Sequence, residues 1–420
     1  MHKTVVINAV GLTPKLLAHA PALSKFAQDE GVSRIIETIP AVTTTMQSTF
    51  LTGKTPRDHG IVGNGWYDRS DAEVKFWKQS NHLVKSGKIW ERARRADPKF
   101  TCANICWWYA MYSSCDVTVT PRPMYPADGR KLPDCWTWPT KLRDDLQERL
   151  GQFPLFKFWG PMTSIESTRW IAKAAIDVDQ GYDPTLTFIY LPHLDYALQK
   201  FGPDHPSIPA EVKKLDTEAV NLFTHYKRKA RVIVLSEYGI TSVERPIHIN
   251  RILREMNLIT VREELGREIL DAGASQAFAV ADHQIAHVYV NEPRVLSLIE
   301  ERLRKTDGIM HVYSGDARKQ IEIDHERAGD LVVLAERNAW FTYYYWLDDS
   351  RAPDFARTVD IHRKPGYDPA ELFIDPKLTA PKFRIARKLL ARKLGFRNLL
   401  DVTPLDATLV QQAWSDLQQL

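Results

Sequence analysis

The pattern of apolar and polar positions along the chain predicts an α/β protein. The stretch 5–10 is apolar except for Asn8, and residues 14–27 then have apolar positions at helical spacing. Two later runs, 185–191 (TLTFIYL) and 231–235 (RVIVL), are continuous and largely apolar, which is typical of strands buried on both faces of a sheet. Further strands are predicted at 34–39 and 100–107, and further helices at 89–95, 142–150, 211–229 and 247–256. Strands that alternate with helical crossovers form a largely parallel central sheet flanked by helices.

The pattern changes after residue 259, where the apolar segments become shorter. Short strands at 278–280, 287–290 and 311–313 surround a helix at 294–305, which predicts a small inserted α+β subdomain at 260–330. The runs 331–336 and 340–347 then return to core-like strands. We therefore expect a core made of 1–259 and 331–380, followed by a basic helical tail at 381–420 that is a solvated face rather than a binding surface.

Residues 118–139 (TVTPRPMYPADGRKLPDCWTWP) are rich in proline and have little periodicity. A loop of this length inside a compact domain is usually functional or disordered, and its aromatic residues argue against disorder. We expect a long ordered loop beside a site.

The stretch 40–64 combines a helix start and a helix stop. Thr44 and Gln47 have the spacing of a capping box, and Gly53 is the expected left-handed stop. The first turn of such a helix offers unpaired backbone N–H groups and the positive end of a dipole, which attract an anion such as phosphate. A threonine hydroxyl there is a candidate nucleophile, and the alternative is that the threonines only cap the helix.

Composition and charge narrow the function. With 44% hydrophobic and 26% charged residues the chain is typical of a folded globular protein, and a formal charge of +4 favours neither nucleic acid nor an anionic membrane as a partner. No apolar run approaches the roughly 18 residues that span a bilayer, and the start MHKTVVINAVG lacks the pattern of a signal peptide. We expect a cytoplasmic protein. Oligomeric state cannot be read from the sequence.

The four cysteines, Cys102, Cys106, Cys115 and Cys135, have neither a zinc-ligand spacing nor the density of a disulfide framework. We expect reduced, mostly buried thiols.

Polar residues follow several of the predicted strands, and in open parallel sheets ligands bind at the carboxyl ends of strands. The clusters are Asn8, the pair His193 and Asp195, the pair Glu237 and Tyr238, and His362 with Asp360. A carboxamide, two carboxylates, a histidine and a threonine in one crevice would suit metal-assisted phosphoryl transfer.

Several short motifs follow one another along the chain between residues 4 and 368. Thr43 stands nine residues before Thr52-Gly53, and Pro56, His59-Gly60-Ile61 and Gly63-Asn64 follow. Next come Asp195, Gln199 and Gly202-Pro203, then Ser236-Glu237-Tyr238-Gly239, and finally His362 ahead of Gly366-Tyr367-Asp368. This arrangement resembles the type I phosphodiesterase and nucleotide pyrophosphatase family of the alkaline phosphatase superfamily, and the phosphonoacetate hydrolase branch is also similar. The resemblance implies an alkaline-phosphatase-like α/β core.

The resemblance also implies a two-metal site, usually with zinc. One metal is held by Asp, His and His, and the other by Asp, Asp, His and the nucleophile. This chain keeps Asp195 and His362 of the first set, with Gln199 in place of the middle His, and of the second set it keeps Thr43. Asn8, Glu237 and Tyr238 stand in place of Asp, Asp and His. Neutral amides and a phenol are poor replacements at a divalent ion, so we expect one zinc or manganese ion rather than two.

Three interpretations compete. In the first, the protein is a hydrolase or transferase of a phosphate ester, with Thr43 as the nucleophile and Glu237 as metal ligand or general base. In the second, a metal-free binding or regulatory protein holds a phosphorylated ligand through the helix N-terminus and basic residues. In the third, the fold serves non-hydrolytic chemistry. Candidate metal ligands are Asp195, His362, Glu237, Gln199 and Asn8, and candidate substrate contacts are Tyr238, Asn64, His193, Arg122 and Arg130.

His283 and His287 are four residues apart on a predicted strand, which directs both to one face. The spacing lacks the geometry that a helix gives to two metal ligands. We expect a structural role for the pair and keep His283 as a reserve ligand.

Overall fold

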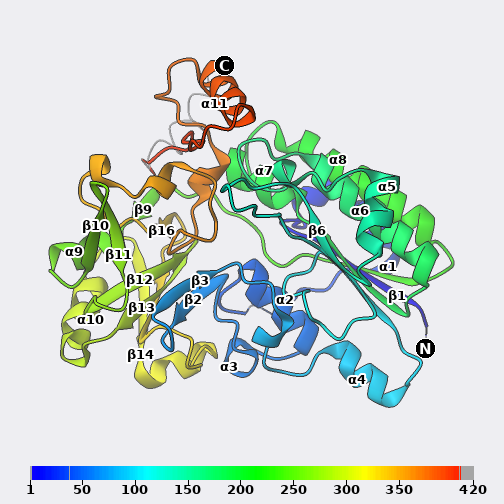
Figure 1. Ribbon diagram of the computed structural model, residues 1–420. Helices are drawn as coiled ribbons and strands as arrows, with labels where there is room; N and C mark the ends of the chain where they lie inside the picture. Colours follow the sequence, from blue (N-terminus) through cyan, green and yellow to red (C-terminus); the bar gives the residue numbers. More distant parts are fainter. Residues whose placement is uncertain (1, 37, 406, 408–420) are drawn as a thin grey trace. The chain divides into compact units, whose positions relative to one another are not determined.

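The computed structural model describes residues 2–36, 38–405 and 407, which fold as two compact units (Figure 1). The first unit comprises Met1–Glu37, Met46–Lys54 and Gln79–Ile240. The second comprises Thr38–Thr45, Thr55–Lys78 and Thr241–Leu420. The division into a core, an inserted subdomain and a tail that we expected uses other boundaries and stays a prediction.

The first unit is built on a six-stranded sheet with the strand order β6-β5-β4-β7-β1-β8. All neighbouring pairs are parallel except β5 and β6. This confirms the largely parallel central sheet. The strands are β1 (Thr4–Ala9), β4 (Cys102–Ile105), β5 (Val117–Pro121), β6 (Cys135–Trp138), β7 (Leu186–Leu191) and β8 (Arg231–Leu235).

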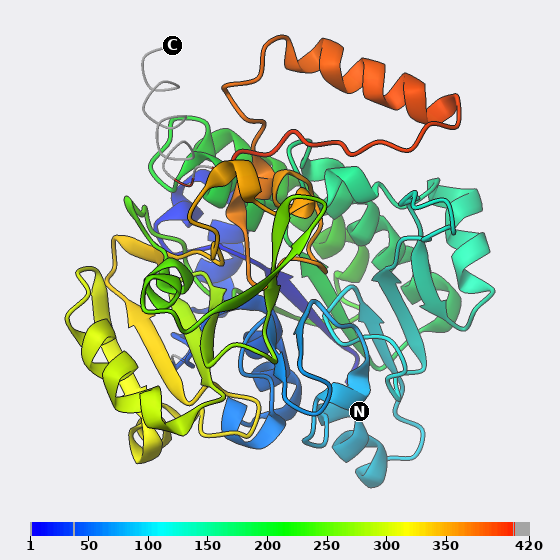
Figure 2. The ribbon, with the colours of Figure 1, turned by 60° about the vertical axis from the view of Figure 1, so that its left-hand side comes forward.

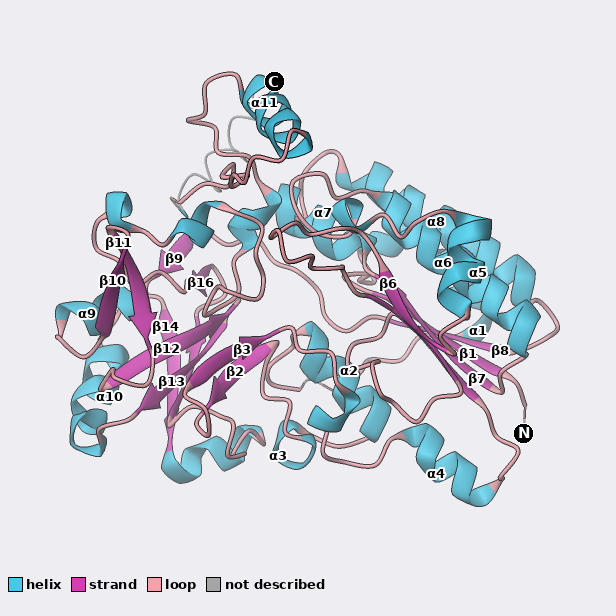
Figure 3. Cartoon of the chain, in the orientation of Figure 1, coloured by secondary structure: helices cyan, strands magenta, loops and turns pink. Residues whose placement is uncertain are grey.

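Helices flank this sheet, and Figure 3 shows α5, α6 and α8 along one of its faces. The α-helices that lie entirely in this unit are α1 (Pro21–Glu30), α4 (Ile89–Ala96), α5 (Leu142–Leu150), α6 (Ile165–Tyr182), α7 (His193–Phe201) and α8 (Ile208–Tyr226). The predicted bounds of α5 and β8 agree with the structure at both ends.

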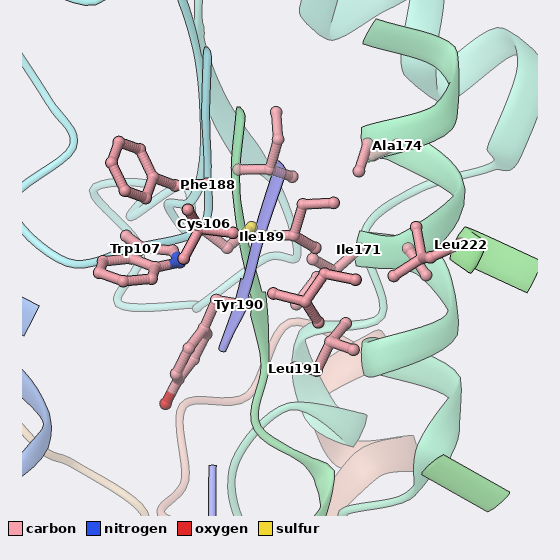
Figure 4. Packing of buried hydrophobic residues seen from close by; sticks show 14 of the residues in the cluster. Cys106, Trp107, Ile171, Ala174, Phe188, Ile189, Tyr190, Leu191 and Leu222 are labelled. Carbon is pink, nitrogen blue, oxygen red and sulfur yellow. The ribbon is translucent and has the colours of Figure 1, made fainter. Parts of the chain in front are cut away.

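The sequence of β7 is apolar at every position except Thr187 because both of its faces are buried. Figure 4 shows Ile189 and Leu191 on the side of Ile171, Ala174 and Leu222, which come from α6 and α8. On the opposite side, the ring of Phe188 lies 4.9 Å from that of Trp107. All six residues of β7 are buried, and this double burial makes β7 the centre of the unit's core.

The second unit contains an antiparallel four-stranded sheet with the order β12-β13-β15-β14. Smaller two-stranded sheets pair β10 with β11, β2 with β3, and β16 with β9. The strands are β2 (Gly65–Asp68), β3 (Glu73–Phe76), β9 (Arg245–Ile247), β10 (Thr260–Glu264), β11 (Arg267–Asp271), β12 (Ala277–Asp282), β13 (Ile285–Val290), β14 (Ile309–Ser314), β15 (Leu331–Ala335) and β16 (Ala339–Phe341). The helices are α3 (Pro56–His59), α9 (Ile249–Glu255), α10 (Leu296–Arg304) and α11 (Pro381–Lys393).

The basic tail begins with α11, which has no buried residue. Figure 2 shows residues 396–405 running back along this helix. Arg384 donates to Asp401 at 2.8 Å and Arg392 donates to the carbonyl of Asn398, also at 2.8 Å. Part of the tail's positive charge is therefore used within the tail. The remainder of the tail, 406 and 408–420, lies outside the described residues.

Two strand predictions were wrong, at 34–39 and over most of 340–347. Residues 34–36, 38 and 39 form no strand, and Ile36 is 89% exposed. The run 331–336 is a strand as predicted, since Leu331–Ala335 forms β15, which pairs with β13 and β14. In the run 340–347, only Trp340 and Phe341 belong to a strand, β16, and Tyr343, Tyr344 and Tyr345 are buried outside it.

The segment 118–139 is also not a plain loop. Its two ends belong to β5 and β6, which pair antiparallel, and a bridge between Met124 and Leu132 extends the hairpin. The sequence did not predict this pairing, because prolines interrupt the segment and leave a strand signal only a few residues long at each end.

The expectation for the cysteines agrees with the structure. All four cysteines are free and buried. Within the described residues, no helix combines the length and the apolar character needed to cross a membrane.

Candidate functional site

The threonine-rich stretch forms α2 (Thr43–Thr52), whose first residue is Thr43. Gly53 ends the helix with φ at 65° and donates its N–H to the carbonyl of Thr49, which confirms the predicted stop. The start differs from the capping box that we expected. The N–H of Thr44 donates to Asn64 Oδ1 at 3.1 Å, and the hydroxyl of Thr44 donates to the carbonyl of Gly63 at 2.8 Å. Asn64 therefore caps α2, because Gln47 is used elsewhere.

Gln47 joins a buried polar cluster at the carboxyl ends of two neighbouring strands of the first unit. Asn8 pairs with Leu235 in the register of β1 and β8, and Glu237 follows two residues later. The side-chain amides of Asn8 and Gln47 both donate to Glu237 Oε1, the latter at 2.5 Å. All three side chains are 4% exposed or less. The convergence of Asn8 and Glu237 at the sheet edge agrees with the sequence prediction.

Asp195 forms a second cluster of the same kind in the first unit. It lies in the first turn of α7, and Gln199 follows one turn later. Gln199 Nε2 donates to Asp195 Oδ1 at 3.0 Å, and the hydroxyl of Tyr238 donates to the same oxygen at 3.1 Å. Asp195 and Glu237 thus each accept hydrogen bonds from two neutral groups on a single oxygen.

These donors do not fit a divalent ion. An amide N–H or a phenol O–H that donates to a carboxylate directs a hydrogen, not a lone pair, toward the position of a cation. Among the residues that the structure describes, no group of three or more His, Cys, Asp or Glu side chains has an arrangement that holds a metal. The set Asn8, Gln199 and Tyr238 is consequently better suited to hydrogen bonding than to the metal ligation that the resemblance implied.

His193, two residues before Asp195 in the sequence, does not share the hydrogen-bond partners of Asp195 given above. Its Nε2 lies 2.9 Å from Glu211 Oε2. This hydrogen bond lowers the pKa of Glu211 to about 2, against the opposing effect of burial. The pair lines a cavity of about 100 Å³ together with Lys200, Lys214 and neighbouring residues of the same unit.

Arg122 and Arg130 are exposed and lie on the hairpin that follows β5. Arg122 donates to Gln79 Oε1 at 3.2 Å, and Arg130 pairs with Asp128 at 2.6 Å. Neither of these two contacts involves the carboxylates of the two clusters, so the role of Arg122 and Arg130 as substrate contacts stays a prediction.

The remaining candidates belong to the second unit. His362 Nδ1 lies 3.3 Å from the carbonyl of Phe76. Asn64 donates through its backbone N–H and its side-chain amide to Asp282, at 2.7 and 3.0 Å. Residues 43–45 of α2 also belong to this unit. The convergence of Thr43 and His362 with Asp195 and Glu237 therefore stays a prediction.

His283 and His287 do not share the face of one strand. His283 lies in the turn between β12 and β13 with φ at 60°, contacts Asp282 at 2.8 Å and stacks on Tyr367. His287 lies in β13, where Nε2 is 3.0 Å from the carbonyl of Val62 and Nδ1 accepts the N–H of Gly329 at 3.1 Å. Burial lowers the pKa of His287 to about 4. The two backbone contacts give His287 the structural role that we expected.

Sequence reasoning missed two parts of this site. Gln47 was interpreted as a capping residue, although its amide connects Glu237 to the backbone N–H of Trp108. Asp282 was not singled out, although it holds Asn64 in place. No signal in the sequence distinguishes these residues, because their partners are distant along the chain.

Comparison with known proteins places this geometry in context. Residues 4–368 match the sequence model of the family described as type I phosphodiesterase / nucleotide pyrophosphatase. An uncharacterised pyrophosphatase/phosphodiesterase of Schizosaccharomyces pombe is 23% identical over 269 residues, which is 63% of this chain and 47% of that protein. The chain therefore spans about half the length of the curated relative that it matches.

Solved structures show the same fold. Phosphonoacetate hydrolase from Sinorhizobium meliloti 1021, in complex with phosphonoformate, has a TM-score of 0.58 at 16% identity, covering 84% of each chain. An inactive form of murine ectonucleotide pyrophosphatase / phosphodiesterase 5, in complex with AMP, has a TM-score of 0.56 at 17% identity, covering 88% of this chain and 85% of that one. The alkaline-phosphatase-like α/β fold that the sequence predicted is confirmed.

Proposed function

Because the chain belongs to the type I phosphodiesterase / nucleotide pyrophosphatase family, we propose that it hydrolyses or transfers the phosphoryl group of a small phosphate ester, with Thr43 as the nucleophile. The observation that carries the proposal is the place of Thr43 as first residue of α2, a ten-residue helix. The positive end of a helix attracts a phosphate group. Solved relatives that hold AMP or phosphonoformate support a small phosphorylated ligand.

In the proposed reaction, the Thr43 oxygen forms a bond to phosphorus while the bond from phosphorus to the ester oxygen breaks. The hydroxyl proton passes to Glu237, and the leaving oxygen takes a proton from water. Water, or an acceptor alcohol in a transferase, then displaces Thr43. Gln47, one turn after Thr43 on α2, donates to Glu237, which supports the choice of Glu237 as the base.

No step of this proposal passes through a metal ion. The expected single zinc or manganese ion, held by Asp195, Glu237 and His362, does not suit the structure, because Asp195 and Glu237 are each bound by two neutral donors. Tyr238, Asn64 and His193 remain candidate substrate contacts.

The neutral donors on Asp195 and Glu237 favour a second candidate function. A metal-free binding or regulatory protein would keep the phosphate site at α2 and lose the chemistry. Neutral donors on both carboxylates suit this alternative, since they replace a catalytic cation with groups that only hold the carboxylates in place.

One set of variants tests the proposal and separates the two candidates. Phosphate monoesters, diesters and phosphonates are screened with wild type, Thr43→Ala and the matched control Thr43→Ser, which keeps a hydroxyl. We expect Thr43→Ala to lose turnover by on the order of 10⁴-fold, with an unchanged circular dichroism spectrum, and Thr43→Ser to keep part of it. Equal turnover in all three proteins would exclude Thr43. Calorimetric binding without any turnover by wild type would favour the binding protein.

A further inference from the structure

We propose that neutral hydrogen-bond donors take the place of divalent cations in this chain, so that its two buried site carboxylates are held without a metal and one substitution, Asn8→Asp, makes the fold metal-responsive. The inference concerns the charge balance of the first unit and does not rest on the proposed function. Glu237 is a carboxylate that is 4% exposed. A buried carboxylate needs a compensating partner, either a cation or several hydrogen bonds.

The hydrogen bonds of Glu237 come from two amides whose orientation is determined. Gln47 Oε1 accepts the backbone N–H of Trp108 at 2.7 Å, so its NH₂ group must face Glu237, to which it donates at 2.5 Å. Turning this amide over would break both contacts. The NH₂ group of Asn8 also faces Glu237. A cation brought to this oxygen would meet amide hydrogens, which carry positive partial charge.

Asn8 shows the cost of this arrangement. Its side chain is fully buried, and its Oδ1 has no hydrogen-bond partner among the described residues. Turning the amide would direct Oδ1 at the carboxylate instead, where two negative groups would repel each other. The contact with Glu237 therefore determines the orientation of Asn8 even though it leaves one polar atom unsatisfied.

Asp195, the second buried carboxylate, is held in the same way as Glu237. Gln199 and Tyr238 both donate to its Oδ1, at 3.0 and 3.1 Å. Gln199 is four residues after Asp195 on α7, a spacing that brings the two side chains together on one helix face. The same solution at two carboxylates shows that the donors form a consistent set.

The consequence is a sharp response to Asn8→Asp. Aspartate has the shape of asparagine, so the strand packing is kept, but it places a second carboxylate against Glu237 and removes a donor. Two adjacent carboxylates repel each other unless a cation bridges them. The variant should be less stable than wild type without metal and should regain stability when zinc or manganese binds the pair.

The test uses the purified full chain and measures metal content and thermal unfolding with EDTA, with zinc and with manganese. We expect wild type to carry no stoichiometric zinc or manganese and to have the same midpoint in all three conditions. In EDTA, Asn8→Asp should unfold at a lower temperature than wild type. With zinc or manganese, the midpoint of the same variant should be clearly higher than in EDTA. The matched control is Asn104→Asp in strand β4 of the same sheet, where the asparagine is equally buried and accepts the N–H of Trp107.

Each outcome decides the proposal. Asn104→Asp should lose stability without recovering it on addition of metal. Stoichiometric metal in wild type, a lower wild-type midpoint in EDTA, or equal metal responses of the two variants would overturn the inference. If Asn8→Asp does not fold, Gln199→His beside Asp195 provides the second variant, and an unchanged midpoint with metal would then count against the proposal. None of these measurements uses turnover, so their failure is distinguishable from failure of the proposed function.

Discussion

Replacing Lys364 by methionine should cost this protein a large part of its stability, because Lys364 is the buried cation of an ion cluster in the second unit. Its ammonium group is 2.7 Å from Asp368 and 2.9 Å from Glu371, and all three side chains are 1–2% exposed. Burial opposes the charge of Lys364, but the two carboxylates outweigh it and raise its pKa. The positive charge is therefore maintained throughout the neutral range.

The magnitude follows from this geometry. At an effective dielectric constant of about 20, two unit charges roughly 3 Å apart attract each other by about 5–6 kcal/mol, and desolvation cancels much of that gain. Removing one partner of a buried pair costs about 3–5 kcal/mol, because the other charge is left uncompensated. Two carboxylates are left here, so Lys364→Met should lose at least about 3 kcal/mol of unfolding free energy near neutral pH.

The assay is urea unfolding followed by tryptophan fluorescence at several pH values. Without Lys364, burial raises the pKa values of the two carboxyls above those of the unfolded chain, so the variant regains stability as the pH falls. Its deficit relative to wild type should shrink between about pH 7 and about pH 4. The triple variant Lys364→Met, Asp368→Asn, Glu371→Gln should recover much of the loss.

The matched control is Lys382→Met, at an exposed position of α11, which should stay within about 0.5 kcal/mol of wild type. A Lys364→Met variant that loses no more than this control would refute the reasoning, and so would a deficit that grows toward acid pH.

Two further predictions concern the second unit and its packing. Burial lowers the pKa of His287 to about 4, so the unfolded chain binds a proton at a higher pH than the folded chain does. Stability therefore falls by about 3 kcal/mol as the pH drops from about 6.5 to about 4. In urea unfolding, His287→Gln should lose less stability than wild type over this range, and an equal loss would assign the acid sensitivity to other groups. A Cβ atom on Gly65 would lie 2.3 Å from the ring of Phe76, so Gly65→Ala should cost about 1–3 kcal/mol of stability. The control is Gly181→Ala in α6, where nothing lies within 4 Å of the added Cβ atom, and it should be neutral or stabilising by up to about 1 kcal/mol. Equal thermal midpoints of the two variants would contradict this prediction.

Local patterns determined much of the secondary structure. The run TLTFIYL contains β7 because its consecutive apolar side chains, 188–191, require cover on both faces, and α6, α8 and Trp107 provide it. The same reasoning failed at Ile35 and Ile36, which are exposed, since an apolar segment forms a strand only where a neighbouring strand pairs with it. The pairing of β15 with β13 and β14 was likewise invisible in the sequence, because strand partners are chosen by the whole fold.

At the candidate site, the sequence by itself placed Asn8 and Glu237 at one sheet edge, because the carboxyl ends of neighbouring parallel strands meet there. Only the tertiary structure decided what these groups do to each other. Gln47 has the residue type and spacing of a capping partner for Thr44, yet its amide donates to Glu237, because Asn64 and Gly63 already bind Thr44 and the buried carboxylate needs a donor. Hydrogen-bond direction depends on which distant groups are buried together, and this information appears only when the chain is folded.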